Sequence, residues 1–281
     1  MPIHDQTYRR YGGVKEVAGR AWVAIMRNGV LTIVRKRMFL GLLLLAWLPF
    51  VVGAVTVYLA ANFPQFSSLL GLTAQRFRDF LETQNFFVFV ITVWVGAGLI
   101  ANDKRANALQ IYLSKPLARV EYIAGKLAIL AVFLLLVTWV PATLLLLLQV
   151  LFTGSFEFLK QNFYLFPAVT VFAFLQVALA SFMMLALSSI SKSSRYVAIL
   201  YAGAVFFSDA IYGLVYLITG STRMSWLSFP ANLRQIGDVV FRLPPRYQDT
   251  PWGASLLAVA VLIGISVWIL ERQVRGVEVV S

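Results

Sequence analysis

The chain has 281 residues, of which 60% are hydrophobic and 13% are charged, and its formal net charge is +12. A soluble domain carries roughly 25% charged residues. The apolar residues here fall into blocks of membrane-spanning length, so the composition indicates an integral membrane protein. Cysteine is absent, which excludes disulfide frameworks and thiolate sites. A zinc site normally needs three or four protein ligands, so the single histidine, His4, does not indicate one.

Residues 1–38 form a basic N-terminal segment. Apolar residues recur at three- and four-residue steps from Val14 to Met26, with charged residues on the other side, which is typical of an amphipathic interfacial helix. Trp22 would be its interfacial anchor, and a helix packed on a soluble partner is the alternative. Three basic residues end the segment: Arg35, Lys36 and Arg37. They are expected to anchor at anionic headgroups, with contact to a partner protein as the alternative.

Residues 39–281 are predicted to form an all-α transmembrane domain with six spans. The first apolar block lacks charges over 39–61 and would reach about 34 Å as a helix, enough to cross the hydrocarbon. Pro49 and Pro141 are expected to interrupt the first and third spans. The six predicted spans are about 39–61, 85–101, 127–153, 161–191, 196–218 and 251–270.

Two connections between the spans carry helical patterns of their own. Residues 62–84 are predicted to be a loop whose charged residues share one short helix: Arg76, Arg78, Asp79 and Glu82. The connection 219–249 contains an amphipathic pattern from Phe229 to Val240, which Pro244 and Pro245 then end.

The basic residues choose the orientation of the chain. More than two thirds of the 24 lysines and arginines lie in segments that six spans place on one side. The positive-inside bias therefore predicts that both termini and the polar insert 96–126 are cytoplasmic. This distribution accounts for the positive charge without a nucleic-acid partner.

The insert 96–126 has the pattern of a short cytoplasmic helix followed by a turn. Leu109 and Tyr112 lie beside each other on a helical face, and Pro116 ends the helix because proline disfavours helical backbone in the residue before it. Such a helix, lying across the ends of two spans, suits docking of another protein. An ordinary loop with a solvated helix is the alternative.

The insert resembles the corresponding segment of ABC-2 type ABC transporter permeases. That family carries an acidic-basic pair, a leucine run, a Ser-x-Pro turn, an arginine and a closing Gly-Lys between its second and third spans. The matching positions here are Asp103, Lys104, Leu109, Leu113, Ser114, Pro116, Arg119, Gly125 and Lys126. The departures are Asp103 in place of glutamate, Asn107 in place of glycine and Ala108 in place of threonine.

The resemblance implies that the insert is a coupling helix seated in a separate cytoplasmic ATPase. The coupling residues would be Asp103, Lys104, Arg105, Leu109, Tyr112, Leu113, Ser114, Pro116 and Arg119. It further implies short re-entrant helices at the outer mouth, a second permease copy, a prokaryotic plasma membrane and export. The chain contains no G-x-x-x-x-G-K-[ST] motif, so it is not expected to be an enzyme, and ATP and Mg²⁺ would bind in the partner.

Asp209 is the candidate for the translocation path, because it is the only ionisable residue well inside a predicted span. The alternative is a solvated carboxylate near a helix break, hydrogen-bonded to Ser208 or Tyr212. The phenylalanines at 86–89 and 206–207 are interpreted as packing or lipid-facing rather than as a substrate cage. A secondary transporter and a structural subunit of a larger membrane complex are the competing functions.

Overall fold

The structure is a computed structural model that describes residues 21–63, 65, 73–108, 118–153 and 162–274. These residues are helical and form no strand. Six helical stretches are long and apolar enough to cross a membrane, which confirms the predicted fold class: Arg37–Asn62, Ala74–Arg105, Arg119–Phe152, Leu165–Ile190, Ser194–Thr219 and Trp252–Gln273. The elements are α1 (Ala21–Val34), α2 (Arg37–Ala46), α3 (Leu48–Asn62), α5 (Ala74–Ile91), the π-helix η1 (Thr92–Gly96), α6 (Ala101–Arg105), α8 (Arg119–Val137), α9 (Trp139–Thr153), α11 (Leu165–Ile190), α12 (Ser194–Thr219), the 3₁₀-helix η2 (Ser225–Leu227), α13 (Phe229–Val240) and α14 (Trp252–Gln273).

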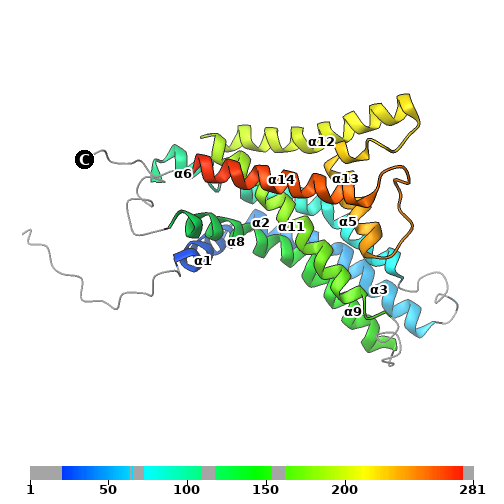
Figure 1. Cartoon of the computed structure of the whole chain (residues 1–281). Coiled ribbons are helices and arrows are strands. Elements are labelled where there is room, and N and C mark those ends of the chain that lie inside the picture. The colour runs from blue at the N-terminus through cyan, green and yellow to red at the C-terminus, as the bar shows by residue number, and fades with distance from the viewer. Residues whose placement is uncertain (1–20, 64, 66–72, 109–117, 154–161, 275–281) are drawn as a thin grey trace, which may run out of the picture.

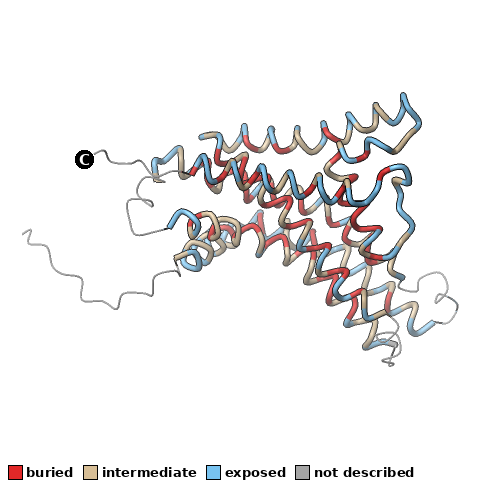
Figure 2. Tube along the Cα trace, in the orientation of Figure 1, coloured by how far each residue is buried: buried red, intermediate tan, exposed pale blue. Residues whose placement is uncertain are grey.

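The bundle has two ends that differ in what lies there. The short helix α6, α1 and the last turn of α14 lie at one end, on the left of Figure 1, and α13 lies at the other. We call these the α6 end and the α13 end. α11 runs through the middle, and 67% of its apolar stretch is buried inside the protein, against 11% in α12. α11 is therefore the core helix and α12 stands at the edge of the bundle, as Figure 2 shows by its mostly exposed or half-buried surface.

The first and third spans are both broken, as the prolines predict. α2 ends before Trp47 and α3 begins with Pro49 in its first turn. α8 ends before Thr138, and α9 begins at Trp139, two residues before Pro141. The second halves pack on each other closely enough that a Cβ on Gly53 would lie 3.0 Å from the Leu145 side chain. The breaks thus change the direction of the first and third spans together, and their second halves, α3 and α9, pack as a pair.

The second span is longer than the predicted 85–101, and the prediction of a loop up to Gln84 is wrong. The helix α5 begins at Ala74, so the charged residues expected on a separate short helix occupy its first turns. The physical reason is tertiary: Arg78 is only 5% exposed and is paired with carboxylates, so charge does not mark the edge of this helix.

The helix α1 packs along α8 through two glycines. A Cβ on Gly125 would lie 2.8 Å from the Cβ of Ile25, and one on Gly29 would lie 2.2 Å from Ile129. The predicted N-terminal helix extends to Val34, beyond Met26, while its expected start at Val14 falls outside the described residues. A location of α1 in the headgroup plane stays a prediction. Its proposed anchors are exposed: Trp22, Arg35, Lys36 and Arg37.

The connection before the last span contains the predicted amphipathic helix. α13 has the expected bounds, Phe229 to Val240, and Ser228 caps it by accepting a hydrogen bond from the Ala231 N–H at 3.0 Å. Arg242 follows with a positive φ of 57°, which turns the chain away from the helix axis. Whether α13 re-enters a membrane stays a prediction.

Candidate functional site at the α6 end and the cavity beside α13

Asp103 on α6 connects the second span to the third. Its Oδ2 accepts from Lys126 Nζ at 2.7 Å and from the Tyr122 hydroxyl, also at 2.7 Å. Tyr122 is fully buried, and the Asp103 and Lys126 side chains are 19% and 12% exposed. Charge-assisted hydrogen bonds in such partly buried surroundings are among the stronger polar contacts. The acidic residue of the insert is thus held against the Gly-Lys that closes it.

The neighbouring Lys104 connects the same short helix to two other spans. Its ammonium donates to the carbonyl oxygen of Ser189, in the last turn of α11, and to Gln273 Oε1 in the last turn of α14 at 3.4 Å. Carbonyl groups at a helix C-terminus lack intrahelical partners and attract cations. Two consecutive residues of α6 therefore hold the ends of three different spans.

A break in the second span lies directly before α6, and a serine from α11 closes it. The backbone between η1 and α6 leaves the helical ladder, and Ser188 Oγ accepts from the N–H groups of Ile100 and Ala101 at 3.1 and 3.0 Å. The same hydroxyl donates to the Ala97 carbonyl at 3.0 Å. Ser188 is fully buried, so without it these backbone groups would lack partners in a dry environment.

The other residues predicted for coupling divide into two groups. Arg105 and Arg119 lie within the insert, one before and one after residues 109–117, and both are exposed. The remaining five lie outside the described residues: Leu109, Tyr112, Leu113, Ser114 and Pro116. The described part of the site thus consists of α6, which Asp103 and Lys104 hold against other helices, and of one exposed arginine on each side of residues 109–117, the segment expected to dock.

The α13 end holds a network of ion pairs with a buried centre. Arg78 of α5 contacts Asp238 of α13 at 3.3 Å, and Asp238 is fully buried. Glu82 pairs with Arg234 at 3.1 Å and accepts a bidentate contact from Arg246 at 3.1 and 2.8 Å. Burial raises the pKa of Asp238 to about 6, against the opposing effect of the Arg78 guanidinium. The network fastens α13 and its following loop over the start of the second span.

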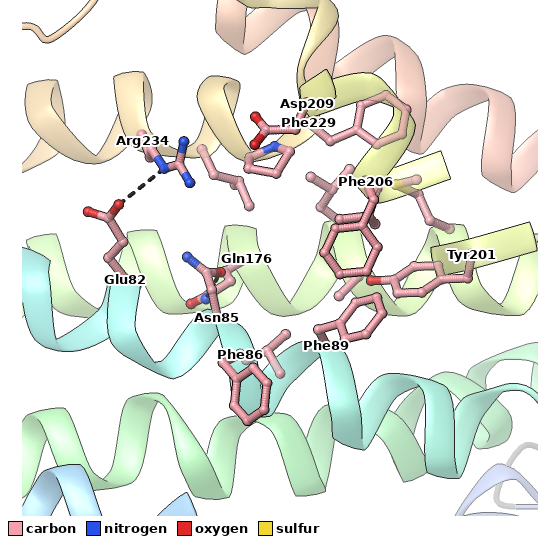
Figure 3. A pocket seen from close by; sticks show the side chains of 17 residues that line it. Glu82, Asn85, Phe86, Phe89, Gln176, Tyr201, Phe206, Asp209, Phe229 and Arg234 are labelled. Atoms are coloured by element: carbon pink, nitrogen blue, oxygen red, sulfur yellow. Dashed lines mark hydrogen bonds and ion pairs between the residues drawn. The ribbon is translucent and has the colours of Figure 1, made fainter. Parts of the chain in front are cut away.

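A cavity of about 270 Å³ lies below this network, between α5, α11, α12 and α13 (Figure 3). Its walls are mostly apolar and include five aromatic side chains: Phe86, Phe89, Tyr201, Phe206 and Phe229. Three of these phenylalanines were predicted only to pack or to face lipid, but Phe86, Phe89 and Phe206 border the cavity. Pockets that bind small molecules are apolar with a few placed polar groups, and this cavity has that composition.

Asp209 borders this cavity from α12. Its Oδ1 accepts from the Ser228 hydroxyl at 2.6 Å, rather than from Ser208 or Tyr212 as the alternative interpretation expected. The helix α12 is continuous through this position, so no helix break explains the carboxylate. Ser208 instead accepts from the Phe229 N–H at 3.3 Å. Asp209 therefore lies where α12 contacts Ser228, beside the cavity, and its role in a translocation path stays a prediction.

Several contacts come from polar residues in or next to the apolar spans that the sequence pattern did not single out. Gln176 Nε2 of α11 donates to Asn85 Oδ1 of α5 at 2.5 Å, and both amides border the cavity. Ser188 and Gln273 at the α6 end were likewise overlooked. Within the described residues, no three His, Asp or Glu side chains come together in a way that could hold a metal ion.

The fold defines an integral membrane protein in which the short helix α6, at the end of the second apolar stretch, is fastened to several other helices. A family model described as ABC-2 family transporter protein matches residues 23–248, which is most of the chain. The chain therefore belongs to the ABC-2 transporter family and is a membrane transport subunit. A comparison with curated proteins finds no match.

Proposed function

We propose that the protein is the permease subunit of an ATP-driven exporter and that a separate cytoplasmic ATPase moves it through the insert 96–126. One observation supports this most: Asp103 and Lys104 fasten α6 to the ends of α8, α11 and α14. A displacement applied at the insert would reach three spans at once. Bistable packed interfaces convert small shifts at one site into helix rearrangements elsewhere.

The energy source in this proposal is a partner chain. The sequence lacks a P-loop, so ATP and Mg²⁺ would bind in the ATPase. The excess of basic residues in the segments around α1, α6 and the end of α14 supports placing the α6 end in the cytoplasm. A prokaryotic plasma membrane is proposed from the family resemblance. Export follows from the family resemblance.

A second permease copy completes the proposed transporter. One chain makes a narrow bundle around α11, and the apolar stretches of α2 with α3 and of α12 are each only 11% buried. Either face offers a surface for a second copy, with lipid covering the other. The translocation path would then lie between two permeases.

The test is copurification of the tagged chain with an ATP-hydrolysing subunit from its native membrane. Charge reversal of two exposed arginines of the insert, Arg105→Glu with Arg119→Glu, is expected to abolish that association. Leu109→Glu, within the insert itself, should do the same. Arg223→Glu, an exposed arginine at the α13 end, is the matched control and should leave the complex intact.

Persistence of the complex in both insert variants would rule out the coupling role. Transport in purified proteoliposomes that depends on an ion gradient and not on ATP would instead establish a secondary transporter. A complex without any ATP-hydrolysing member would favour the structural-subunit alternative.

A further inference from the structure

The cavity beside Asp209 carries an unbalanced charge. Three acidic or basic side chains border it: Glu82, Arg234 and Asp209. Glu82 and Arg234 neutralise each other at 3.1 Å, and Glu82 is also held by Arg246. Asp209 makes no ion pair with any described residue, and its one hydrogen-bond partner there is the neutral Ser228 hydroxyl. The Asp209 charge also acts on Arg234 across the cavity, but no described cation lies within ion-pair distance of Asp209, so Glu82, Arg234 and Asp209 together leave the cavity with a net negative charge.

A second polar group in the cavity is also an unmatched acceptor. Gln176 is 1% exposed, and its Nε2 donates to Asn85 Oδ1 and to the Leu81 carbonyl. Its Oε1 is buried with no hydrogen-bond partner within the described residues. A buried acceptor without a donor costs free energy, and the negative end of this amide dipole adds to the negative potential at the cavity wall.

The aromatic side chains complete the recognition pattern. Phe206 and Phe229 border the same cavity as Asp209, and Phe89 stands against Phe206 with ring centroids 5.2 Å apart (Figure 3). Aromatic faces attract cations through their quadrupole, most strongly where water is excluded. On α12 the residues at 201, 205 and 209 follow a four-residue step, so Tyr201 and Val205 continue the same wall as an apolar surface.

We propose that this cavity binds a small amphipathic organic cation. The ammonium group lies at Asp209 among the aromatic rings, and the apolar body lies along the wall formed by α5, α11 and α12. At about 270 Å³ the cavity is smaller than the roughly 300 Å³ at which drug-sized pockets begin, so the ligand is a small molecule or the charged end of a longer one. As a substrate class, this proposal rests on the transport function proposed above; as a binding site, it does not.

The test measures binding to the purified full-length chain in phosphatidylcholine nanodiscs, without an ATPase. Equilibrium dialysis compares three probes with the same phenyl body: 2-phenylethylamine, which is protonated at neutral pH, the neutral 2-phenylethanol and the anionic 3-phenylpropionate. The amine is expected to bind at least tenfold more tightly than the alcohol, and the anion should not bind measurably.

Two variants locate the site. Asp209→Asn keeps a side-chain oxygen for Ser228 but removes the charge, and it should abolish the preference for the amine over the alcohol. Asp79→Asn is the matched control, because this half-exposed carboxylate lies at the same end of the bundle and does not border the cavity. It should leave amine binding unchanged. Phe206→Leu, at an exposed position of α12, should weaken the amine several-fold more than the alcohol.

Equal binding of amine and alcohol by the unmutated chain would overturn the proposal, whatever the variants do. An unchanged amine preference in Asp209→Asn, or its loss in Asp79→Asn, would overturn it as well. None of these outcomes bears on whether the chain associates with an ATPase. If the cation does not bind but the ATPase complex is found, the proposed permease function stands without this site. If the cation binds but no ATPase complex is found, the binding site stands without the permease function.

Discussion

Asp103 of α6 and Lys126 of α8 form an ion pair of 2.7 Å, which joins the first part of the insert to its last residue. The two residues are 23 positions apart in the sequence, and the segment expected to dock on the ATPase lies between them. Tyr122 supports the same carboxylate, so the base of the insert is rigid whatever its tip contacts.

Asp103→Asn is expected to destabilise the protein by about 2 to 4 kcal/mol, because Lys126 would be left with an unpaired charge at a mostly buried position. Asp103→Lys combined with Lys126→Asp should recover part of this loss. Thermal unfolding in detergent micelles measures both. Arg105→Gln, at an exposed neighbouring position, should change the midpoint little. A swap no more stable than the single variants would show that Asp103 acts through Tyr122 alone.

Lys104→Met is expected to separate ATP hydrolysis from transport. The substitution keeps the apolar stem but removes the donor to Ser189 and Gln273, so α6 loses the contacts that Lys104 makes with the ends of α11 and α14. In reconstituted transporter, ATPase activity should persist while substrate movement falls at least tenfold. Lys192→Met removes an exposed positive charge in the turn that follows α11 and should leave both rates unchanged. Parallel loss of both rates in Lys104→Met would instead indicate a failure of assembly.

Ser188→Ala is expected to cost about 1 to 3 kcal/mol, because two backbone N–H groups and one carbonyl at the break before α6 lose their partner. Ser181→Ala is a close control on the same helix. Ser181 is also buried, but its hydroxyl makes no hydrogen bond within the described residues, so its removal should be nearly neutral. Hydrogen exchange at Ile100 and Ala101 gives a local readout, and equal costs for the two serines would refute the assigned role.

Asp238 is expected to make the stability of the α13 end depend on pH. Its pKa is raised to about 6 in the fold, from an ordinary value near 3.8, mainly by burial. The folded state therefore binds this proton more tightly, and the stabilisation is present at low pH and lost as pH rises through about 6. Relative to the native chain, Asp238→Asn should gain up to about 3 kcal/mol of unfolding free energy between about pH 4 and pH 7.

Asp249 provides a control of opposite sign for this pH dependence. Hydrogen bonds from the Thr222 N–H and from the hydroxyls of Ser221 and Thr222 hold the pKa of this exposed carboxyl below its usual range. The stabilisation that ionised Asp249 gives to the folded state is present above the ordinary pKa of the carboxyl and is lost as pH falls. Asp249→Asn should therefore matter least at low pH, and a pH profile of the same sign in both variants would contradict the assignment.

The order of the helices was accessible from local pattern alone. Charge-free apolar stretches predict the spans, Pro49 and Pro141 predict the breaks in the first and third, and the pattern from Phe229 to Val240 predicts α13 with its observed bounds. Each of these features rests on residues near one another in the chain, because helix length, proline geometry and amphipathic period are local properties.

Tertiary structure decided where the polar residues of the spans find their partners. Charge at Arg78 and Glu82 suggested a loop, yet these side chains belong to the second span, because Asp238 and Arg246 come from more than 150 residues away to pair with them. Sequence likewise singled out Asp209 but could not place Ser228, Gln176 and the aromatic rings around one cavity. The residues themselves determined that this chain is a six-span helical protein of a transporter family. Only the packing of distant helices decided which polar groups are satisfied and which remain open to a ligand, since a buried charge is stable only beside a partner that local sequence does not contain.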